Sequence, residues 1–253
     1  MSSDYMRISF FEEFPTDDNL RKLDMISFPT KLYVAAHSLN EFNVIRKKIK
    51  SKHVKEVVYW PILTKKEGYW ISPFSSGNAL RRVFGELEES AISVMLDLEL
   101  PTRQNPLLYL SQGVFFFRNK ARIWKFIREY QGKLYLAEYY PQGRLQEKLL
   151  KLFGLHYDLS KVFVMKMLYR SLHHFSDDFL KMALKKGVGN LRERFIVGVG
   201  TIARGIHGTE RILSAAQLEQ DLRIASSEGV QEVVVFRLGG LEEKYVRVIK
   251  KKT

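Results

Sequence analysis

The chain has 253 residues, a formal net charge of +13 at pH 7 and no cysteine. The absence of cysteine excludes disulfides, thiolate nucleophiles and cysteine-based metal sites, and no apolar run approaches the ~18 residues that a membrane span requires. A hydrophobic content of 45% is typical of a globular protein with a sizeable core. We therefore expect one domain over residues 1–253 and no membrane partner.

The start of the chain and its charge give two further expectations. Met1–Tyr5 lack the basic and apolar regions of a signal peptide, which favours a cytoplasmic location. An exported protein shortened at its start would look the same. The positive charge favours anionic surroundings, including nucleic acid. The basic stretches at 46–52 and 250–252 have no interleaved aromatic residues, so no motif supports a nucleic-acid partner.

Eight short apolar runs recur along the chain, and each is followed by a stretch that can form a helix. The runs occupy residues 8–14, 32–38, 57–63, 92–101, 133–141, 161–169, 195–202 and 230–240. Strands that alternate with helices indicate βαβ units and a parallel sheet. Eight such units in about 250 residues match a (β/α)8 barrel. The sequence therefore predicts an α/β fold, a single (β/α)8 TIM barrel, with its chemistry at the C-terminal ends of the strands.

The helices predicted between these strands begin at recognisable caps. Thr16 precedes the first helical segment, and Ser38 with Glu41 resembles a capping box. Further helices are expected over 41–50, 78–84, 120–130, 145–153, 177–186 and 213–226. The two longest connections, 64–77 and 102–131, follow the third and fourth strands, so we expect them to form a lid or a cleft wall at the active face.

The run at 92–101 carries two carboxylates near its end. Alternate residues of a strand share a face, so Asp97 and Glu99 share one. The opposite face is wholly aliphatic and suits packing against the outer helices: Ile92, Val94, Leu96, Leu98 and Leu100. The face with the acids must point into the barrel, where the two residues are about 6–7 Å apart along the strand. Repulsion between the carboxylates should raise one pKa, as a general acid requires. The alternative is a structural pair neutralised by Arg or Lys.

The D-x-E that ends at Glu99 resembles the fourth barrel strand of the chitinase-type glycoside hydrolases of family eighteen. It is similar, more loosely, to the Chalaropsis-type lysozymes of family twenty-five. In the chitinase group this strand reads D-x-x-D-x-D-x-E, and here Ile92 and Met95 occupy the two upstream aspartate positions. The resemblance implies Glu99 as the acid and Asp97 as its partner.

The chitinase group also has M-x-Y on the sixth strand, which Met167-Leu168-Tyr169 matches. Arg170 follows where that group usually has an acid. The resemblance implies that Tyr169 hydrogen-bonds to the reacting acetamido group. Independently, Tyr169 alternates with Met167, Met165 and Phe163, so it is expected to face inward at the end of the strand.

Further candidates flank this pair. Glu13 at the end of the first strand shares the parity of Phe11, so it is expected to face inward and assist. Glu138 lies at the end of the fifth strand and alternates with Leu134 and Leu136, so the pattern does not decide whether its side chain faces into the barrel or outward. Aromatic residues at the expected mouth suit the stacking of sugar rings, and we take Trp60 and Tyr140, with Glu138, as substrate-binding candidates. Each of these has an alternative in ordinary packing or a rim salt bridge.

A second function is compatible with the last two strands. The glycine-rich loops at 200–208 and 237–240 sit where barrels often bind phosphate, with Arg204 and Arg237 as reinforcement. A phosphorylated-sugar aldolase or isomerase is then possible, and Lys166 is its candidate for a Schiff base, although its parity argues for an outward direction. A non-catalytic barrel that binds polyanions is a third possibility.

We expect no metal site and no cofactor. Histidine is sparse, no H-x-H or H-E-x-x-H occurs, and the chain has neither a P-loop nor G-x-G-x-x-G. The leading interpretation is therefore a hydrolase that cleaves a glycosidic bond in a carbohydrate, and the resemblance implies an N-acetylated polymer. Glu99 would be the acid, assisted by Asp97, Glu13 and Tyr169.

Overall fold

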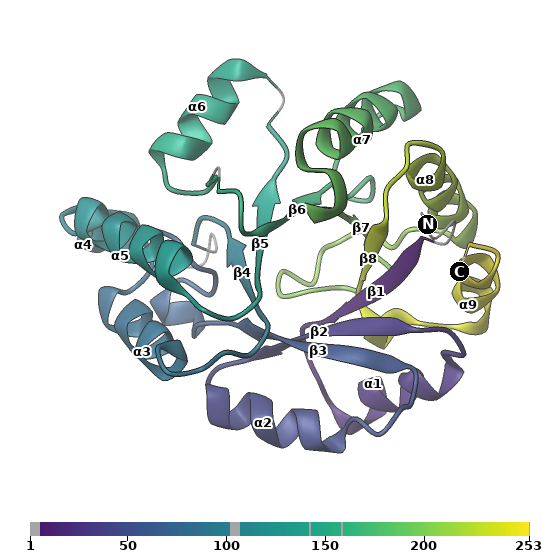
Figure 1. The fold of residues 1–253 in the computed structure, drawn as a ribbon, viewed down its shortest axis with the longest axis horizontal. Helices are drawn as coiled ribbons and strands as arrows, with labels where there is room; N and C mark the ends of the chain where they lie inside the picture. Colours follow the sequence, from purple (N-terminus) through teal and green to yellow (C-terminus); the bar gives the residue numbers. More distant parts are fainter. Residues whose placement is uncertain (1–5, 102–106, 142, 158, 253) are drawn as a thin grey trace. The chain divides into compact units, whose positions relative to one another are not determined.

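A computed structural model of the chain describes residues 6–101, 107–141, 143–157 and 159–252. Within them, eight parallel strands form a closed barrel in sequence order (Figure 1). The strands are β1 (Arg7–Glu12), β2 (Thr30–Ala36), β3 (Val54–Pro61), β4 (Val94–Leu98), β5 (Leu134–Tyr139), β6 (Phe163–Met167), β7 (Phe195–Gly200) and β8 (Glu232–Phe236). Each overlaps one of the eight apolar runs, so the predicted (β/α)8 barrel is confirmed.

Helices connect the strands. The α-helices are α1 (Asp17–Arg21), α2 (Leu39–Lys48), α3 (Gly77–Leu87), α4 (Leu107–Gly113), α5 (Phe116–Glu129), α6 (Arg144–Leu152), α7 (Asp177–Leu191), α8 (Ala215–Ser227) and α9 (Glu243–Lys250). Short 3-10 segments are η1 (Lys22–Met25), η2 (Lys65–Glu67), η3 (Arg192–Arg194) and η4 (Leu238–Gly240). The expected N-cap bonds are present, since Thr16 Oγ1 accepts from Asn19 N and Ser38 Oγ accepts from Glu41 N. The Glu41 side chain accepts from His37 N, one residue before the position that a capping box uses. The sequence analysis did not foresee α4 or α9.

The chain divides into two compact units. The first unit comprises Met1–Ala35, Ile45–Val57 and Val164–Thr253, and it holds β1, β7 and β8. The second unit comprises Ala36–Val44 and Val58–Phe163, and it holds β4 and β5. A single-domain organisation stays a prediction.

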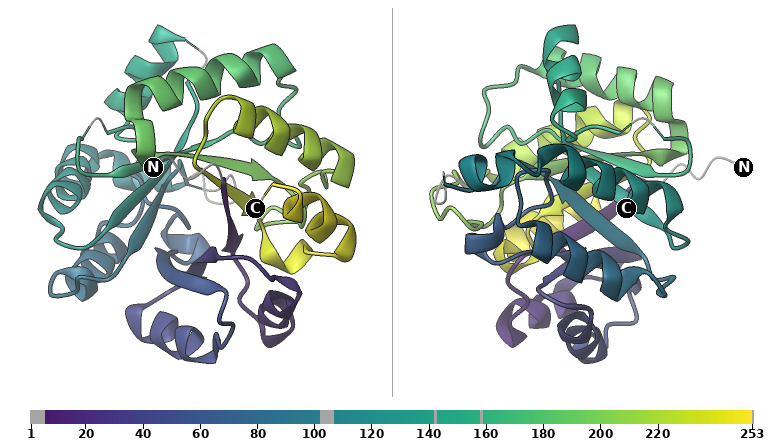
Figure 2. Two further views of the ribbon diagram at one scale, coloured as in Figure 1. Left: turned by 45° about the vertical axis from the view of Figure 1, so that its right-hand side comes forward. Right: turned by 90° about the vertical axis from the view of Figure 1, so that its left-hand side faces the viewer.

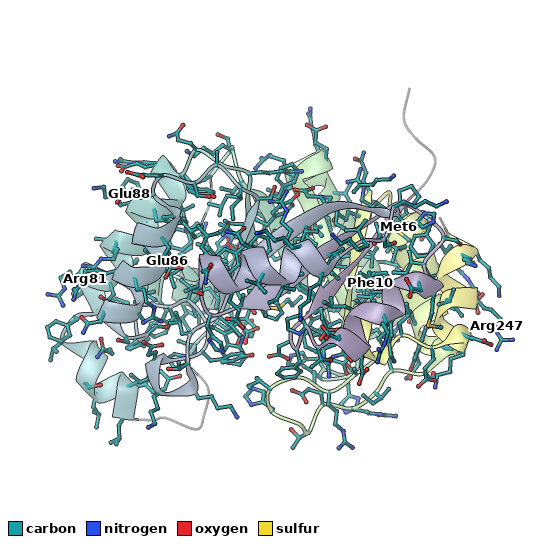
Figure 3. All side chains as sticks on the ribbon, turned by 90° about the horizontal axis from the view of Figure 1, so that it is seen from below. Met6, Phe10, Arg81, Glu86, Glu88 and Arg247 are labelled. Atoms are coloured by element: carbon teal, nitrogen blue, oxygen red, sulfur yellow. The ribbon has the colours of Figure 1, made fainter. Side chains whose placement is uncertain are left out.

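In the first unit, β1 pairs with β2 and with β8, so that Phe10 lies beside Leu32 and Val235. Phe10 lies on β1 and Met6 directly precedes that strand (Figure 3), and both side chains are buried. At the N-terminal end of these strands, buried Glu232 accepts hydrogen bonds from Ser9 Oγ at 2.9 Å and from Lys31 Nζ at 2.7 Å. Pairing compensates the cost of burying this charge.

In the second unit, α3 packs against α5 (Figure 2). The stacked rings of Phe84 and Phe126 are 4.3 Å apart. The outer face of α3 is charged, and Arg81 and Glu88 project from it (Figure 3). Glu86 of the same helix accepts a hydrogen bond of 2.8 Å from Leu39 N at the start of α2. These contacts hold α3, the helix that precedes β4 in the chain, against α5 and the start of α2.

Candidate active site

Asp97 and Glu99 lie on the inner face of β4. Pairing with β5 places Asp97 opposite Ala137 and Leu98 opposite Glu138. The Glu138 carboxylate faces the segment after α6, since it accepts from Tyr157 N at 3.1 Å. Connections run outside a closed barrel, so the face that carries Glu138 is the outer one. The opposite face, with Asp97, points into the barrel.

Tyr139 at the end of β5 holds the Glu99 side chain. Tyr139 Oη donates a hydrogen bond of 2.9 Å to Glu99 Oε2. Burial raises the pKa of Glu99 to about 7, because desolvation disfavours the carboxylate, while the bond from Tyr139 lowers that pKa. Burial and the neighbouring Glu99 raise the pKa of Tyr139, so the phenol remains a donor. A carboxyl group with a pKa near neutrality can release and recover a proton at the pH of the cell, as a general acid does.

Asp97 is buried beside this pair, and its charge also raises the pKa of Tyr139. The phenol therefore lies within electrostatic reach of both acids of β4. Two carboxylates so placed are inequivalent, since Tyr139 donates its hydrogen bond to Glu99. When two carboxyl groups have different environments, their pKa values differ. One can then act as the acid while the other assists as a carboxylate.

The connection between β3 and α3 is hydrogen-bonded to β4. Ile71 N donates a hydrogen bond of 3.0 Å to Asp97 O, which ties this connection to the strand that carries the acids. Buried serines stiffen it, because Ser75 Oγ donates to Trp70 O at 2.7 Å and accepts from Ser72 N at 3.1 Å. A rigid connection of this kind suits a site that must hold its substrate in one orientation.

Glu13 lies at the end of β1 in the first unit and is buried. Gly205, in the connection after β7, approaches it closely. A Cβ on Gly205 would lie 2.8 Å from Glu13 Oε2 and 3.2 Å from Glu210 Oε1. Glu210 is also buried, and its Oε1 accepts from His207 N at 3.2 Å. Two carboxylates therefore meet around Gly205, and the sequence analysis named one of them.

Tyr169, which follows β6, also lies in the first unit. Its ring is 5.9 Å from that of Phe236 at the end of β8. Gly198 of β7 leaves room for it, since a Cβ there would lie 3.3 Å from Tyr169 Cε1. Tyr169 and Glu13 thus belong to one unit and the acids of β4 to the other, and whether the four act together stays a prediction.

Arg237 was expected to bind substrate or phosphate, and the structure gives it a different role. Its Nη1 donates to Glu12 Oε1 at 2.9 Å, and its Nε donates to Arg204 O at 2.9 Å. Gly239 N donates to Glu12 Oε2 at 2.6 Å. Burial raises the pKa of Glu12, while the Arg237 charge and the amides of Phe14 and Gly239 lower it. Two of the donors expected for a phosphate, Arg237 Nη1 and Gly239 N, are therefore used by the Glu12 carboxylate, which disfavours the sugar-phosphate alternative.

The same holds for Glu138, which was expected to contact substrate. It is fully buried on the outer face of β5, and its two oxygens lie 2.6 Å from His156 Nδ1 and 3.1 Å from Tyr157 N. Its role is to anchor the segment after α6. Trp60 is buried in β3, so it contributes to packing in this structure. Tyr140 is half-buried, and burial and then the Glu147 charge raise its pKa.

Lys166, the Schiff-base candidate, is buried in β6 between Met165 and Met167. Met167 lies beside Gly198, whose position faces Tyr169. Because neighbours along a strand alternate, Lys166 lies on the other face, away from Tyr169. Its placement agrees with the outward direction inferred from its parity and gives no support to Schiff-base chemistry at the mouth.

Two contacts of the candidate acids escaped the sequence analysis. One is the bond from Tyr139 to Glu99, which depends on the β4–β5 register. Glu210 lies in a connection with no strand parity to reveal its direction. The register of β4 and β5 would have predicted the contact of Tyr139 with Glu99. The small residue Gly205 could have indicated close packing near Glu13.

Neither a protein-family model nor a curated protein sequence matches the chain. Solved structures do match in fold. The PgaB (BpsB) glycoside hydrolase domain from Bordetella bronchiseptica is 12% identical with a TM-score of 0.55, and the match covers 96% of this chain and 95% of that one. The spore cortex-lytic enzyme SleL from Bacillus megaterium QM B1551 is 12% identical with a TM-score of 0.55, over 99% of this chain and 75% of that one.

A D-tagatose 3-epimerase-like protein is 13% identical with a TM-score of 0.52, over 97% of this chain and 95% of that one. Similarities at this level of identity establish the architecture, which many chemistries share. The chain is a (β/α)8 barrel similar in fold to glycoside hydrolases.

Proposed function

We propose that this protein hydrolyses a glycosidic bond, with Glu99 as the proton donor. The observation that carries the proposal is the environment of Glu99, a carboxyl group at the C-terminal end of β4 whose pKa burial raises to about 7 and whose Oε2 accepts from Tyr139. The similarity in fold to the PgaB glycoside hydrolase domain supports the same reaction class. The substrate we favour is a polymer of N-acetylated sugars, as the D-x-E and M-x-Y resemblance implies.

The reaction assigns a step to each acid. Protonated Glu99 gives its proton to the glycosidic oxygen while the bond from that oxygen to the anomeric carbon breaks. The buried Asp97 carboxylate stabilises the positive charge that develops on the sugar, or orients the acetamido group that reacts with it. Water then supplies hydroxide to the anomeric carbon, and its proton returns to Glu99. Glu13 and Tyr169 are proposed to assist, and Glu13→Gln and Tyr169→Phe should each lower kcat.

Release of reducing ends from oligosaccharides of N-acetylglucosamine, of glucosamine and of glucose tests this function. Loss of a general acid typically lowers the rate by about 10²–10⁴-fold, so Glu99→Gln should lose activity by that factor. Glu89→Gln, which changes an exposed carboxylate in the same unit, should not. The proposal fails if folded wild-type protein cleaves none of these glycans or if Glu99→Gln retains the wild-type rate.

A further inference from the structure

Large apolar side chains are exposed in one part of the second unit. Among the described residues, thirteen large apolar side chains are exposed, and nine of them lie between residues 107 and 152. The nine are Leu107, Leu110, Val114, Phe115, Phe117, Trp124, Leu145, Leu149 and Leu152. Scattered exposed apolar residues need no explanation, but a concentration of this kind marks an interaction surface.

The first part of this surface is a stripe on α4 and the start of α5, which adjoin in Figure 1. Leu107, Leu110, Val114 and Phe117 are 69%, 77%, 78% and 80% exposed. Leu107 and Leu110 lie on α4 three residues apart, the spacing that places side chains on one face of a helix. Val114 lies in the turn after α4, and Phe117 lies in the first turn of α5. In an ordinary surface helix apolar residues of this kind face the core, whereas here they are exposed.

The second part is α6, which has the same inverted pattern. Leu145, Leu149 and Leu152 are exposed at helical spacing, and Leu150 is the buried residue of this helix. A helix that turns one leucine inward and three outward gains little from packing on its own barrel. Its apolar face is therefore available to a partner.

Aromatic contacts join the two parts. Phe116 of α5 lies 6.5 Å from Phe153, the residue after α6, and Phe74 lies 5.1 Å from Phe116. Lys120 Nζ also donates to Leu152 O at 2.8 Å. The stripes of α4–α5 and α6 are thus parts of one supported region, which we call the apolar face.

The charge around the apolar face selects the partner. Residues 107–152 include nine Lys or Arg and three Glu, and Glu138 is buried. A second copy of this chain would bring the same positive charges together, which disfavours a homodimer. Two of the arginines lie over exposed rings, Arg118 at 4.4 Å from the Phe115 centroid and Arg128 at 4.3 Å from the Trp124 centroid. Aromatic and aliphatic side chains bordered by cations match a surface with anionic headgroups above an apolar interior.

We propose that the apolar face docks this protein on the surface of a bilayer that contains anionic phospholipids. Leucine and phenylalanine side chains enter the boundary between headgroups and acyl chains, while the lysines and arginines extend to the phosphates. None of the helices in the described ranges is long and apolar enough to cross a membrane. We expected no membrane partner because the sequence has no segment that could span a membrane, and docking on a membrane surface needs no such segment. The docking proposal is independent of the proposed glycosidase function.

Flotation with vesicles tests the docking. Wild-type protein should float with vesicles of phosphatidylcholine mixed with phosphatidylglycerol, and far less with phosphatidylcholine alone. Leu110→Glu and Phe117→Glu should each lower the affinity about tenfold, because each removes the burial of one large side chain. Raising the salt concentration should weaken binding by screening the headgroups. Met182→Glu is the matched control, since Met182 is 56% exposed on α7, outside the apolar face.

Three results would overturn the proposal. One is a wild-type protein that does not float with anionic vesicles. Another is affinity that Leu110→Glu and Phe117→Glu leave unchanged while both variants keep the wild-type melting temperature. A third is a wild-type dimer, detected by light scattering, that Leu110→Glu converts to a monomer, because a second copy would then occupy the face.

Discussion

The hydrogen bond from Tyr139 to Glu99 leads to a quantitative prediction about an ionisation. Tyr139→Phe removes the donor that lies 2.9 Å from Glu99 Oε2 and stabilises its charged form. A hydrogen bond to a charged group contributes about 1.5–3 kcal/mol, and one pKa unit corresponds to about 1.4 kcal/mol. Water can replace part of the bond because Glu99 is only half-buried. We therefore expect the pKa of Glu99 to rise by about one unit above its value of about 7.

The assay is a carbon-13 NMR titration of the Glu99 side-chain carboxyl in wild type and variant. Because Glu99 acts in its protonated form, the alkaline limb of the pH–rate profile should move upward by the same amount in Tyr139→Phe. Tyr140→Phe, which removes the neighbouring phenol, is the control and should leave the Glu99 pKa in place. A Glu99 pKa that falls or stays unchanged in Tyr139→Phe would refute the reasoning.

Three further predictions concern stability. The pKa of Glu99 in the folded state, about 7, lies above its ordinary 4.5, so wild type loses stability as the pH rises from about 4.5 to about 7. In urea denaturation, Glu99→Gln should therefore gain unfolding free energy relative to wild type across that window, by up to about 3 kcal/mol; a constant difference would contradict this. Gly205→Ala should lower stability by about 1–3 kcal/mol, because its Cβ would meet heavy atoms at 2.8 and 2.9 Å. Gly189→Ala is the control, because a Cβ at Gly189 would meet no heavy atom within 4 Å, and this variant should be neutral or stabilising. Equal melting temperatures for Gly205→Ala and Gly189→Ala would contradict the prediction. Arg237→Met leaves the buried Glu12 carboxylate without its cation, at a cost of about 3 kcal/mol or more, and a wild-type melting temperature would show that the pair contributes little.

The barrel was predictable because its signal is local. Each strand is a short apolar run bounded by polar or turn residues, and the βα period repeats eight times. The faces of β4 followed from strict alternation, which needs no knowledge of the partner strands. Alternation also predicted that Glu13 faces inward, although it did not reveal what this side chain contacts.

The remaining features depend on contacts that are distant in sequence. Glu12 is held by Arg237, which is 225 positions away, so neither residue indicated that the other would neutralise it. The Glu99–Tyr139 bond depends on the register of two strands, and a shift of one residue would have placed Tyr139 on the other face. Helix α4 was not predicted, although Leu107 and Leu110 have the spacing of one helix face, and the sequence did not show that these side chains would be exposed.

A crystal structure of the Glu99→Gln variant with an uncleaved N-acetylglucosamine oligosaccharide tests the central claim most directly. The account predicts a glycosidic oxygen within about 3 Å of the side chain at position 99, with Asp97 beside the sugar that would carry positive charge. A glycan bound with no glycosidic oxygen near position 99, at the mouth or elsewhere on the barrel, would contradict it.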